Sequence, residues 1–277
     1  MASNYSHFAG KPSLQNNAAF EMKKPSIIWR TANRLLSSFG CELRPLKPEG
    51  PQFAMDAVLA RAAARGVKIG TVVDLGAAAG RWTRRALRHF PEARFLMVDP
   101  LEERRAPLEQ MKAANPNADY ILAAAGAARG EARFTVGADL DGSGIYDGPG
   151  SRAVPVIALD GEFATRQMPA PFLLKFDTHG FELPILAGAK DTLSKTAAIL
   201  MECYNFQLTQ GCLRFHEMCA HLDALGFRPA DIAEPMLRPG DGVLWQLIFF
   251  FSRRIRLASR TRRTSVRHEV FHRHTFV

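Results

Sequence analysis

The feature that most constrains the fold of this chain is the alternation of short apolar segments with helical segments between residues 71 and 253. Short runs rich in Val, Ile, Leu and Phe are typical of strands buried on both faces. We predict strands at Thr71–Leu75, Phe95–Val98, Tyr120–Ala124, Glu131–Val136, Val154–Ala158, Phe172–Phe176, Ala197–Glu202, Phe227–Ile232 and Val243–Phe251. We predict helices at Ser26–Phe39, Phe53–Arg65, Arg81–His89, Glu102–Ala114, Leu183–Leu193 and Leu213–Leu225. This order predicts an α/β fold, with a mostly parallel sheet, helices on both faces and one antiparallel strand from the final hairpin.

The two ends of the chain differ in composition from this region. Residues 1–24 are polar and predict a disordered segment, whereas residues 25–66 predict a helical lead-in. Residues 252–277 hold eight arginines and one glutamate, so they supply +7 of the formal net charge of +9. We therefore predict a basic, disordered tail at residues 254–277. Such a tail either attracts an anionic partner or is a solvated segment without a specific partner.

The sequence gives no support to a membrane-spanning or secreted class. No apolar run reaches the roughly 20 residues that a membrane-spanning helix needs, and the N-terminus lacks the basic and apolar regions of a secretory signal. The four cysteines form no CxxC pair, which predicts a reducing, cytoplasmic setting. Cys212, His216 and Cys219 recur at helical spacing, and we interpret them as packing residues in preference to zinc ligands.

A glycine-containing loop, VDLGAAAGRWT at residues 73–83, follows the first predicted strand. Gly76, Ala77 and Gly80 would let the backbone pass close to a ligand. The loop matches neither the G-x-G-x-x-G pattern of dinucleotide sites nor the GK[ST] ending of a P-loop, which disfavours a nicotinamide dehydrogenase. Asp74 ends the strand, where a carboxylate would repel a pyrophosphate but attract the ammonium group of S-adenosylmethionine.

A second acid strengthens the prediction of a nucleoside ligand. Asp99 ends the next predicted strand, 25 residues after Asp74, where a carboxylate can accept hydrogen bonds from both ribose hydroxyls. We therefore predict S-adenosylmethionine as the cofactor, bound between the two acids. Trp82 opens the following helix beside the loop, and it either lines this site or packs in the core.

From Thr71 to Arg253 the sequence resembles the FkbM family of S-adenosylmethionine-dependent methyltransferases. The family's D-V-G-A-N-x-G loop is matched at residues 74–80, except that Ala78 replaces the Asn, and Asp99-Pro100 resembles its acid–proline pair. The most specific similarity is to its K-x-D-x-x-G-x-E motif, matched by Lys175, Asp177, Gly180 and Glu182. His179 is a departure, because the family usually has Gln or Glu there.

The resemblance implies a Rossmann-like class I methyltransferase fold over residues 67–253, with a seven-stranded sheet in which one strand is reversed. It implies a cofactor site that includes Pro100 together with the glycine loop and Asp177. It also implies transfer of a methyl group to a hydroxyl oxygen of a sugar, a glycolipid or a secondary metabolite.

Four residues are candidates for catalysis. Lys175, Asp177 and His179 follow the strand expected beside the glycine loop, and Glu202 ends the next strand. Alternate side chains of a strand share a face, so Lys175, Asp177 and His179 should point together. Methyl transfer to a hydroxyl needs an aligned acceptor and a group that takes its proton. Asp177 could orient the hydroxyl or act as the base, Lys175 could stabilise developing negative charge, and His179 has a suitable ordinary pKa, near 6.5.

Several alternatives stay open at this point. The arginine-rich tail could serve an RNA methyltransferase, although the rest of the chain has little excess charge and predicts no specific nucleic-acid partner. The tail could instead contact an anionic membrane, and a non-catalytic protein that binds S-adenosylmethionine would keep the same loop. Asp177 and Glu202 could hold magnesium, but two carboxylates are not a dedicated ligand pattern and we do not expect a metal.

Overall fold

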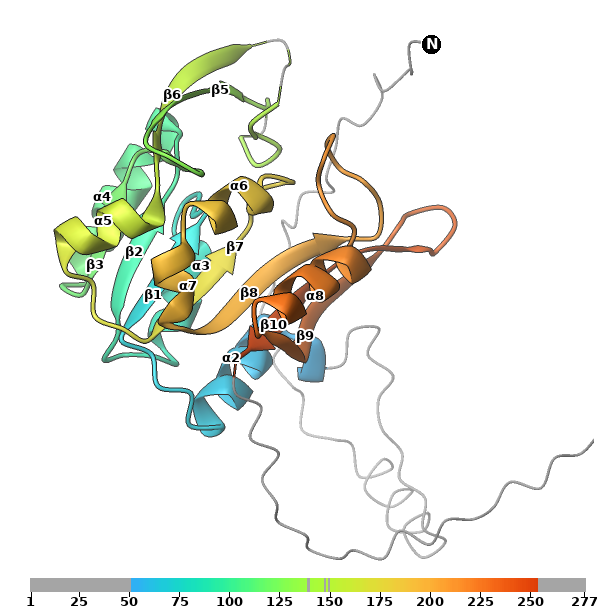
Figure 1. Ribbon diagram of the computed structural model, residues 1–277, viewed down its shortest axis with the longest axis horizontal. Coiled ribbons are helices and arrows are strands. Elements are labelled where there is room, and N and C mark those ends of the chain that lie inside the picture. Colours follow the sequence, from blue (N-terminus) through green and yellow to red (C-terminus); the bar gives the residue numbers. More distant parts are fainter. Residues whose placement is uncertain (1–50, 139, 147, 149, 254–277) are drawn as a thin grey trace, which may run out of the picture. The chain divides into compact units, whose positions relative to one another are not determined.

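The computed structural model describes residues 51–253 except 139, 147 and 149. Its main feature is a seven-stranded sheet of order β3-β2-β1-β7-β8-β10-β9 (Figure 1). The strands are β1 Thr71–Leu75, β2 Arg94–Val98, β3 Ala118–Ile121, β7 Phe172–Phe176, β8 Thr196–Tyr204, β9 Arg228–Leu237 and β10 Leu244–Ser252. The predictions for residues 1–24, Ser26–Phe39 and 254–277 fall outside the described residues.

The sheet is parallel except for one strand. β1 pairs in parallel with β2 and β7, β2 pairs in parallel with β3, and β7 pairs in parallel with β8. β10 is antiparallel to both of its neighbours, β8 and β9. The predicted α/β, Rossmann-like fold is therefore confirmed, and its single reversed strand comes from the final hairpin as expected.

Helices cover both faces of this sheet. They are α2 Met55–Ala64, α3 Arg81–Leu87, α4 Arg105–Ala114, α5 Leu159–Arg166, α6 Glu182–Ala187, α7 Lys190–Ser194 and α8 Phe215–Ala224, with the 3-10 turns η1 Pro51–Phe53 and η2 Glu102–Arg104. One apolar core joins α2, α3 and α4 to Val72 and Leu173, and a second joins α5 to α8 to Val73 and Leu174. Neighbouring strand residues thus enter opposite cores, which explains why the strands read as continuous apolar runs. α2, which the sequence placed in the lead-in, belongs to the first core.

The segments predicted at Tyr120–Ala124, Glu131–Val136 and Val154–Ala158 do not all join the main sheet. The first divides into β3 and β4 Ala124–Ala125. β4 then forms a separate sheet of order β4-β6-β5 with β5 Gly130–Thr135 and β6 Ser151–Ile157. Half of β5 is exposed, which suits a small sheet covered on one side better than the buried main sheet.

Two helical predictions also need correction. The helix predicted at Leu183–Leu193 is divided into α6 and α7 around Gly188, where a Cβ atom would lie 2.2 Å from the backbone oxygen of Gly126. That close approach leaves room only for glycine and ends the first helix. α5 was not predicted, because its sequence is short and contains Gly161. None of the described helices is long and apolar enough to cross a bilayer.

The order of the strands places β1 beside β7. The chain builds outward from β1 to β3 and then returns to β7 on the other side of β1, so Asp74 and Lys175 become register partners although they lie about a hundred residues apart. In open parallel sheets, ligands bind beyond the carboxyl ends of the strands at such a reversal. This is where the candidate site lies.

Candidate active site

The glycine loop after β1 is held closely against the residue that follows β7. Gly76 has a φ of 74°, and a Cβ atom at this position would lie 2.0 Å from the backbone oxygen of Asp177. The N–H groups of Gly76 and Ala77 donate to the carbonyl of Val98 at 2.9 and 3.2 Å. The loop is therefore fixed between the ends of β2 and β7, and only glycine fits at its first position.

Asp99 follows β2 and is bonded into the same loop. Its two carboxylate oxygens accept hydrogen bonds from the N–H groups of Ala78, at 2.8 Å, and of Leu101, at 3.0 Å. Burial raises the pKa of Asp99, and these hydrogen bonds, with Arg104, only partly oppose the shift. Each oxygen keeps a second lone pair. Acceptance of the ribose hydroxyls by Asp99 fits this geometry and stays a prediction.

Asp74, at the end of β1, is enclosed by protein groups and is 1% exposed. Its Oδ2 accepts a hydrogen bond from the hydroxyl of Thr83 at 2.7 Å, and its Oδ1 lies 2.8 Å from Nζ of Lys175. This geometry does not favour the direct contact with an ammonium group that the sequence suggested for Asp74. It favours an indirect role, in which Asp74 holds Lys175 and the first turn of α3.

Lys175 connects Asp74 to the outer part of the site. Its Nζ donates to the carbonyl of Gly76 at 3.0 Å and lies 3.4 Å from Oδ2 of Asp177. Burial by itself would lower the pKa of Lys175, but the charges of Asp74 and Asp177 outweigh this effect and raise it. Lys175 therefore stays an ammonium ion, which can stabilise negative charge but cannot accept a proton.

His179 is oriented by the backbone of the loop between β5 and β6. Its Nδ1 lies 3.1 Å from the backbone oxygen of Ser143. Because a carbonyl can only accept, Nδ1 carries the hydrogen, and Nε2 carries a lone pair in the neutral ring. Nε2 is buried and has no hydrogen-bond partner among the described residues. It lies 3.4 Å from Oδ1 of Asp177 and 3.9 Å from Oε2 of Glu202.

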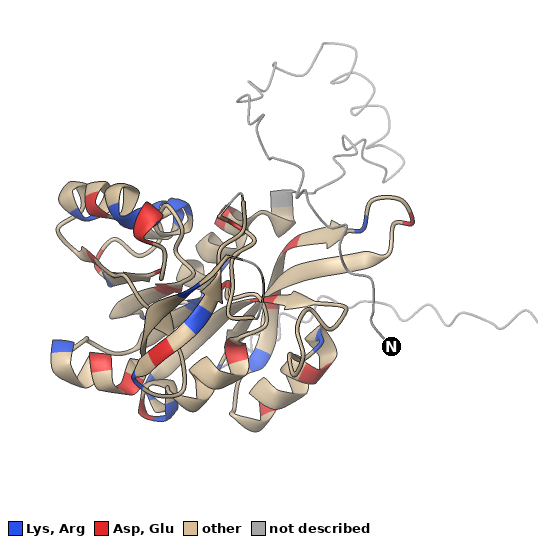
Figure 2. Cartoon of the chain, turned by 90° about the horizontal axis from the view of Figure 1, so that it is seen from above, with Lys and Arg blue, Asp and Glu red and all other residues tan. Residues whose placement is uncertain are grey.

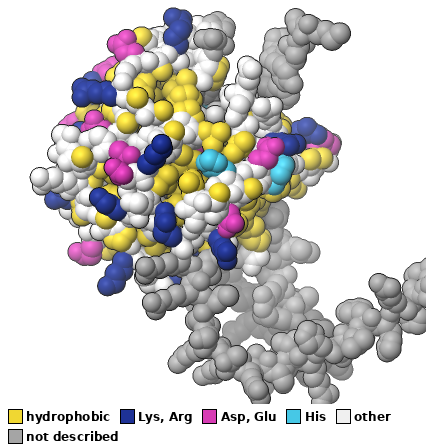
Figure 3. Space-filling view, in the orientation of Figure 1, with side chains coloured by type: hydrophobic (Ala, Val, Ile, Leu, Met, Phe, Trp, Pro, Cys, Tyr) yellow, Lys and Arg dark blue, Asp and Glu magenta, His cyan; other side chains and the backbone are white. Residues whose placement is uncertain are grey.

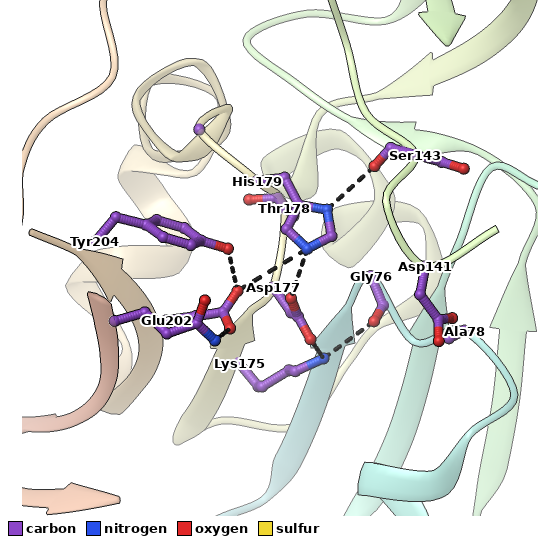
Figure 4. A network of polar contacts seen from close by, with 12 residues as sticks. Gly76, Ala78, Asp141, Ser143, Lys175, Asp177, Thr178, His179, Glu202 and Tyr204 are labelled. Carbon is purple, nitrogen blue, oxygen red and sulfur yellow. Dashed lines mark hydrogen bonds and ion pairs between the residues drawn. The ribbon is translucent and has the colours of Figure 1, made fainter. Parts of the chain in front are cut away.

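Glu202 lies near the end of β8 and is held by two side chains. Oε2 accepts a hydrogen bond from the hydroxyl of Tyr204, and Oε1 accepts one from the side-chain amide of Gln246 on β10. One atom each of Asp177, His179 and Glu202 lie within 4.8 Å of one another, and Figure 4 shows the three side chains converging. We refer to these three residues as the Asp–His–Glu cluster.

Other predicted residues surround the cluster or lie apart from it. Glu182 begins α6 and accepts hydrogen bonds from the hydroxyl of Thr178 and the N–H of Gly180, both at 3.0 Å, so it closes the turn instead of reaching the cluster. Burial raises its pKa. Trp82 packs with the core of α2 to α4, and the centroid of its ring lies 5.9 Å from Nζ of Lys175. Pro100 is half-buried beside Asp99.

The cysteine and histidine residues near α8 do not gather as ligands. Cys212 precedes the helix instead of sharing its face, and His216 is exposed. Among residues 51–253, apart from the three left undescribed, the Asp–His–Glu cluster is the one group of His, Cys, Asp or Glu with ligand spacing. The packing interpretation agrees with Cys212, which is buried, and with Cys219, which packs against the core of α5 to α8, but it is wrong for the exposed His216.

The loop between β5 and β6 reaches the glycine loop as well as His179. Asp141 accepts a hydrogen bond from Arg104 at 2.6 Å and lies 3.6 Å from a side-chain nitrogen of Arg81. Together with the contact between Ser143 and His179, these interactions hold part of the loop beside both the glycine loop and the cluster.

Charged residues are unevenly distributed in the described part. Figure 2 shows that they lie mostly on helices and loops, whereas the central strands carry few. In Figure 3, hydrophobic side chains gather in the middle of the visible face, with a histidine among them. Asp74 and Lys175 are therefore exceptional as charged residues in the two central strands, β1 and β7.

Four groups of the site were not predicted from the sequence. Thr83 lies on the first turn of α3, and Tyr204 follows Glu202 at the two-residue spacing that places both on one face of a strand, so these two had a usable signal. Gln246 interrupts an apolar run, which marks it as unusual without indicating its partner. The contact made by the carbonyl of Ser143 could not be predicted, because every residue has a backbone carbonyl and the sequence does not show which one contacts His179.

Comparisons with known proteins agree with the resemblance noted in the sequence. Residues 74–229 match the family described as the Methyltransferase FkbM domain. No curated protein matches the chain. Among solved structures, the methyltransferase FkbM from Methylobacillus flagellatus KT is 17% identical, with a TM-score of 0.42, over 65% of this chain and 43% of that protein.

Two further solved structures are similarly distant. EvdMO1 is 16% identical, with a TM-score of 0.38, over 80% of this chain and 47% of its own. A putative O-methyltransferase from Klebsiella pneumoniae is 10% identical, with a TM-score of 0.44, over 84% of this chain and 93% of its own. This chain thus spans less than half the length of the first two proteins. Since the matched domain covers more than half of the 277 residues, the chain belongs to the FkbM methyltransferase family.

Proposed function

We propose that this protein transfers a methyl group from S-adenosylmethionine to a hydroxyl oxygen of a sugar, a lipid-linked sugar or a secondary metabolite. One observation carries the proposal. Lys175 contacts Asp74 and Gly76 beneath the glycine loop and also approaches Asp177 in the Asp–His–Glu cluster. A single buried charge therefore joins the expected cofactor side of the site to the expected acceptor side.

The cofactor would be held by the glycine loop and by Asp99. The glycine loop passes close to Asp177, and its backbone lies at the carboxyl edge of the sheet. A nucleoside binds at this edge in folds of this type. Asp99 has one unused lone pair on each carboxylate oxygen for the two ribose hydroxyls. When bound, S-adenosylmethionine supplies an electrophilic methyl group on a cationic sulfur.

The cluster supplies what a hydroxyl acceptor needs. An alcohol must lose its proton as its oxygen forms the new bond to carbon, and Nε2 of His179 and the two carboxylates are proton acceptors at one place. Lys175 stays protonated, so it offsets negative charge that develops at the oxygen. The products are the methyl ether, S-adenosylhomocysteine and one proton, which passes from the cluster to solvent.

The test is transfer of labelled methyl from S-adenosylmethionine to fractions of a cell extract by the purified full-length protein. We expect label in a sugar, lipid or small-molecule fraction, and we expect Asp177→Asn to reduce it at least about a hundredfold, since a positioned proton acceptor contributes roughly 10²- to 10⁴-fold. Label in RNA alone would contradict the proposed acceptor. Failure to bind S-adenosylhomocysteine in calorimetry would contradict the use of this cofactor.

A further inference from the structure

We infer that the Asp–His–Glu cluster is a binding site for one divalent cation of the Mn²⁺ type. The inference deepens the proposed function, and it rests on that function for the nature of the acceptor as a hydroxyl compound. Its basis is the spacing of one atom each from Asp177, His179 and Glu202, all within 4.8 Å of one another. Asp177 follows β7, Glu202 lies near the end of the neighbouring strand β8, and His179 lies in the turn after β7. Their side chains converge on one place (Figure 4).

Each ligand has the kind of outer partner that metal ligands typically have. A metal-binding histidine usually donates its second ring N–H to a carbonyl or carboxylate, and its carboxylate neighbours are themselves hydrogen-bonded. Here Nδ1 of His179 lies against the carbonyl of Ser143. Glu202 accepts from Tyr204 and Gln246, and Asp177 lies beside Lys175. With these outer contacts in place, one atom of each residue still lies within 4.8 Å of the others.

The position of Nε2 of His179 is the strongest sign that a cation belongs there. With the hydrogen on Nδ1, Nε2 presents a lone pair to the oxygens of Asp177 and Glu202 at 3.4 and 3.9 Å. A cation placed among these three atoms would be attracted by all of them. Nε2 is also buried and makes no hydrogen bond to any other described residue, so it faces the two carboxylates alone.

The local charge points the same way. Asp74, Asp177 and Glu202 bring three carboxylates to this end of the sheet, and Lys175 supplies one ammonium group. Three carboxylates against one ammonium group leave this end of the sheet with an excess of negative charge, which a divalent cation would offset. The sequence suggested only Asp177 and Glu202 as an oxygen pair, and the turn after β7, where His179 has a φ of 51°, adds the third ligand.

The donor set selects the type of ion. Two carboxylates and one imidazole suit Mn²⁺, because carboxylates favour hard cations and imidazole favours transition metals. Zinc in closed structural sites takes four ligands, often cysteine, and calcium takes six to eight oxygens. A six-coordinate ion held by three protein atoms keeps positions open for ligand oxygens.

The open positions define the class of acceptor. Two neighbouring oxygens of one molecule, such as a vicinal diol, an α-hydroxy acid or a hydroxyketone, would bind the ion together. One of these oxygens would be the hydroxyl that is methylated. Binding to the cation would lower its pKa, and its proton would pass to solvent as the methyl group leaves the sulfur, because the cluster atoms would then hold the ion. An acceptor with a single isolated hydroxyl would be a much poorer substrate.

The test measures metal binding directly, without turnover. Tag-free full-length protein is treated with a chelator, dialysed and titrated with Mn²⁺, with free Mn²⁺ followed by electron paramagnetic resonance. We expect one ion per chain, and we expect His179→Ala and Glu202→Gln each to weaken binding roughly tenfold or more. His216→Ala is the matched control, because His216 is an exposed histidine on α8 and should leave binding unchanged.

Calorimetry with S-adenosylhomocysteine separates failure of this inference from failure of the proposed function. The cation site is wrong if the nucleoside binds but the wild-type protein takes up no Mn²⁺. It is also wrong if both cluster variants bind Mn²⁺ as well as the wild type does. In either case His179 or a carboxylate acts as the proton acceptor instead. If Mn²⁺ binds through the cluster but the nucleoside does not, the cation site stands and the methyl-transfer function fails. Tyr204→Phe keeps all three ligands and should weaken Mn²⁺ binding less than His179→Ala does.

Discussion

Nζ of Lys175 lies 2.8 Å from Oδ1 of Asp74, between adjacent positions of the two central strands β7 and β1. Both side chains are buried, with 7% and 1% exposure. A buried charge without its partner is strongly destabilising, so neither residue is expected to tolerate loss of the other. The pair fixes the relative position of the glycine loop and the residue that begins the Asp–His–Glu cluster.

The first prediction concerns this pair. Lys175→Met leaves Asp74 buried without a counter-charge and should lower the free energy of unfolding by about 3–5 kcal/mol. The double variant Asp74→Asn/Lys175→Met should lose less than the two single variants added together, because no isolated charge remains. Urea unfolding measures all three. Lys190→Met, at an exposed lysine that begins α7, is the control and should change stability by less than about 0.5 kcal/mol. If the losses of unfolding free energy in the two single variants add up to the loss in the double variant, the two side chains do not interact.

The second prediction concerns Gly76. Gly76 and Gly66 both have a φ of 74°, but a Cβ atom at Gly66 meets nothing within 4 Å, whereas one at Gly76 lies 2.0 Å from the oxygen of Asp177. Gly66→Ala should therefore cost only the left-handed backbone strain of about 1–2 kcal/mol. Gly76→Ala adds the displacement of the loop, so it should cost more and also weaken binding of S-adenosylhomocysteine. Urea unfolding and calorimetry on both variants test this, and equal losses of stability with unchanged binding would refute it.

A third prediction follows from the raised pKa of Asp99. The pKa of Asp99 is higher in the folded protein than in the unfolded chain. Its contribution to the free energy of unfolding is therefore fully present at a pH below the unfolded-state pKa, and it is lost as the pH rises through the folded-state pKa. Ribose hydroxyls would donate to the ionised carboxylate and offset that loss. Affinity for S-adenosylhomocysteine should therefore rise with pH across the same window, and protein without ligand should become less stable.

Calorimetric titrations at a series of pH values measure the affinity. Asp99→Asn cannot ionise, so its weaker binding should be nearly independent of pH in this window. A wild-type affinity that stays flat, or a variant that keeps the wild-type slope, would show that another group controls binding.

Much of the main sheet was predictable from the sequence, because strands buried on both faces leave uninterrupted apolar runs. β1, β7 and β10 were predicted to within one residue at each end for this reason. The small sheet was not predicted as a separate unit, since its half-exposed strands carry a mixed pattern. The break between α6 and α7 depends on the approach of Gly126, which is distant in the sequence.

The site was predictable to a different degree at each position. Lys175, Asp177, His179 and Glu202 stand out as polar residues at strand ends, and the structure brings them together. The burial of Asp74 could not be inferred, because it depends on the position of Thr83 and on the register between β1 and β7. The tautomer of His179 depends on a backbone carbonyl, which no residue type reveals.

The most direct test of the central claim is the nature of the new bond. The protein is supplied with S-adenosylmethionine labelled with ¹³C at the methyl group and with the acceptor fraction that takes up label, and the product is examined by NMR. The account predicts a methoxy carbon on a molecule that carries a neighbouring oxygen, with the signal lost in Asp177→Asn and kept in Lys190→Met. A methyl group on nitrogen or carbon, or full product formation by Asp177→Asn, would contradict it.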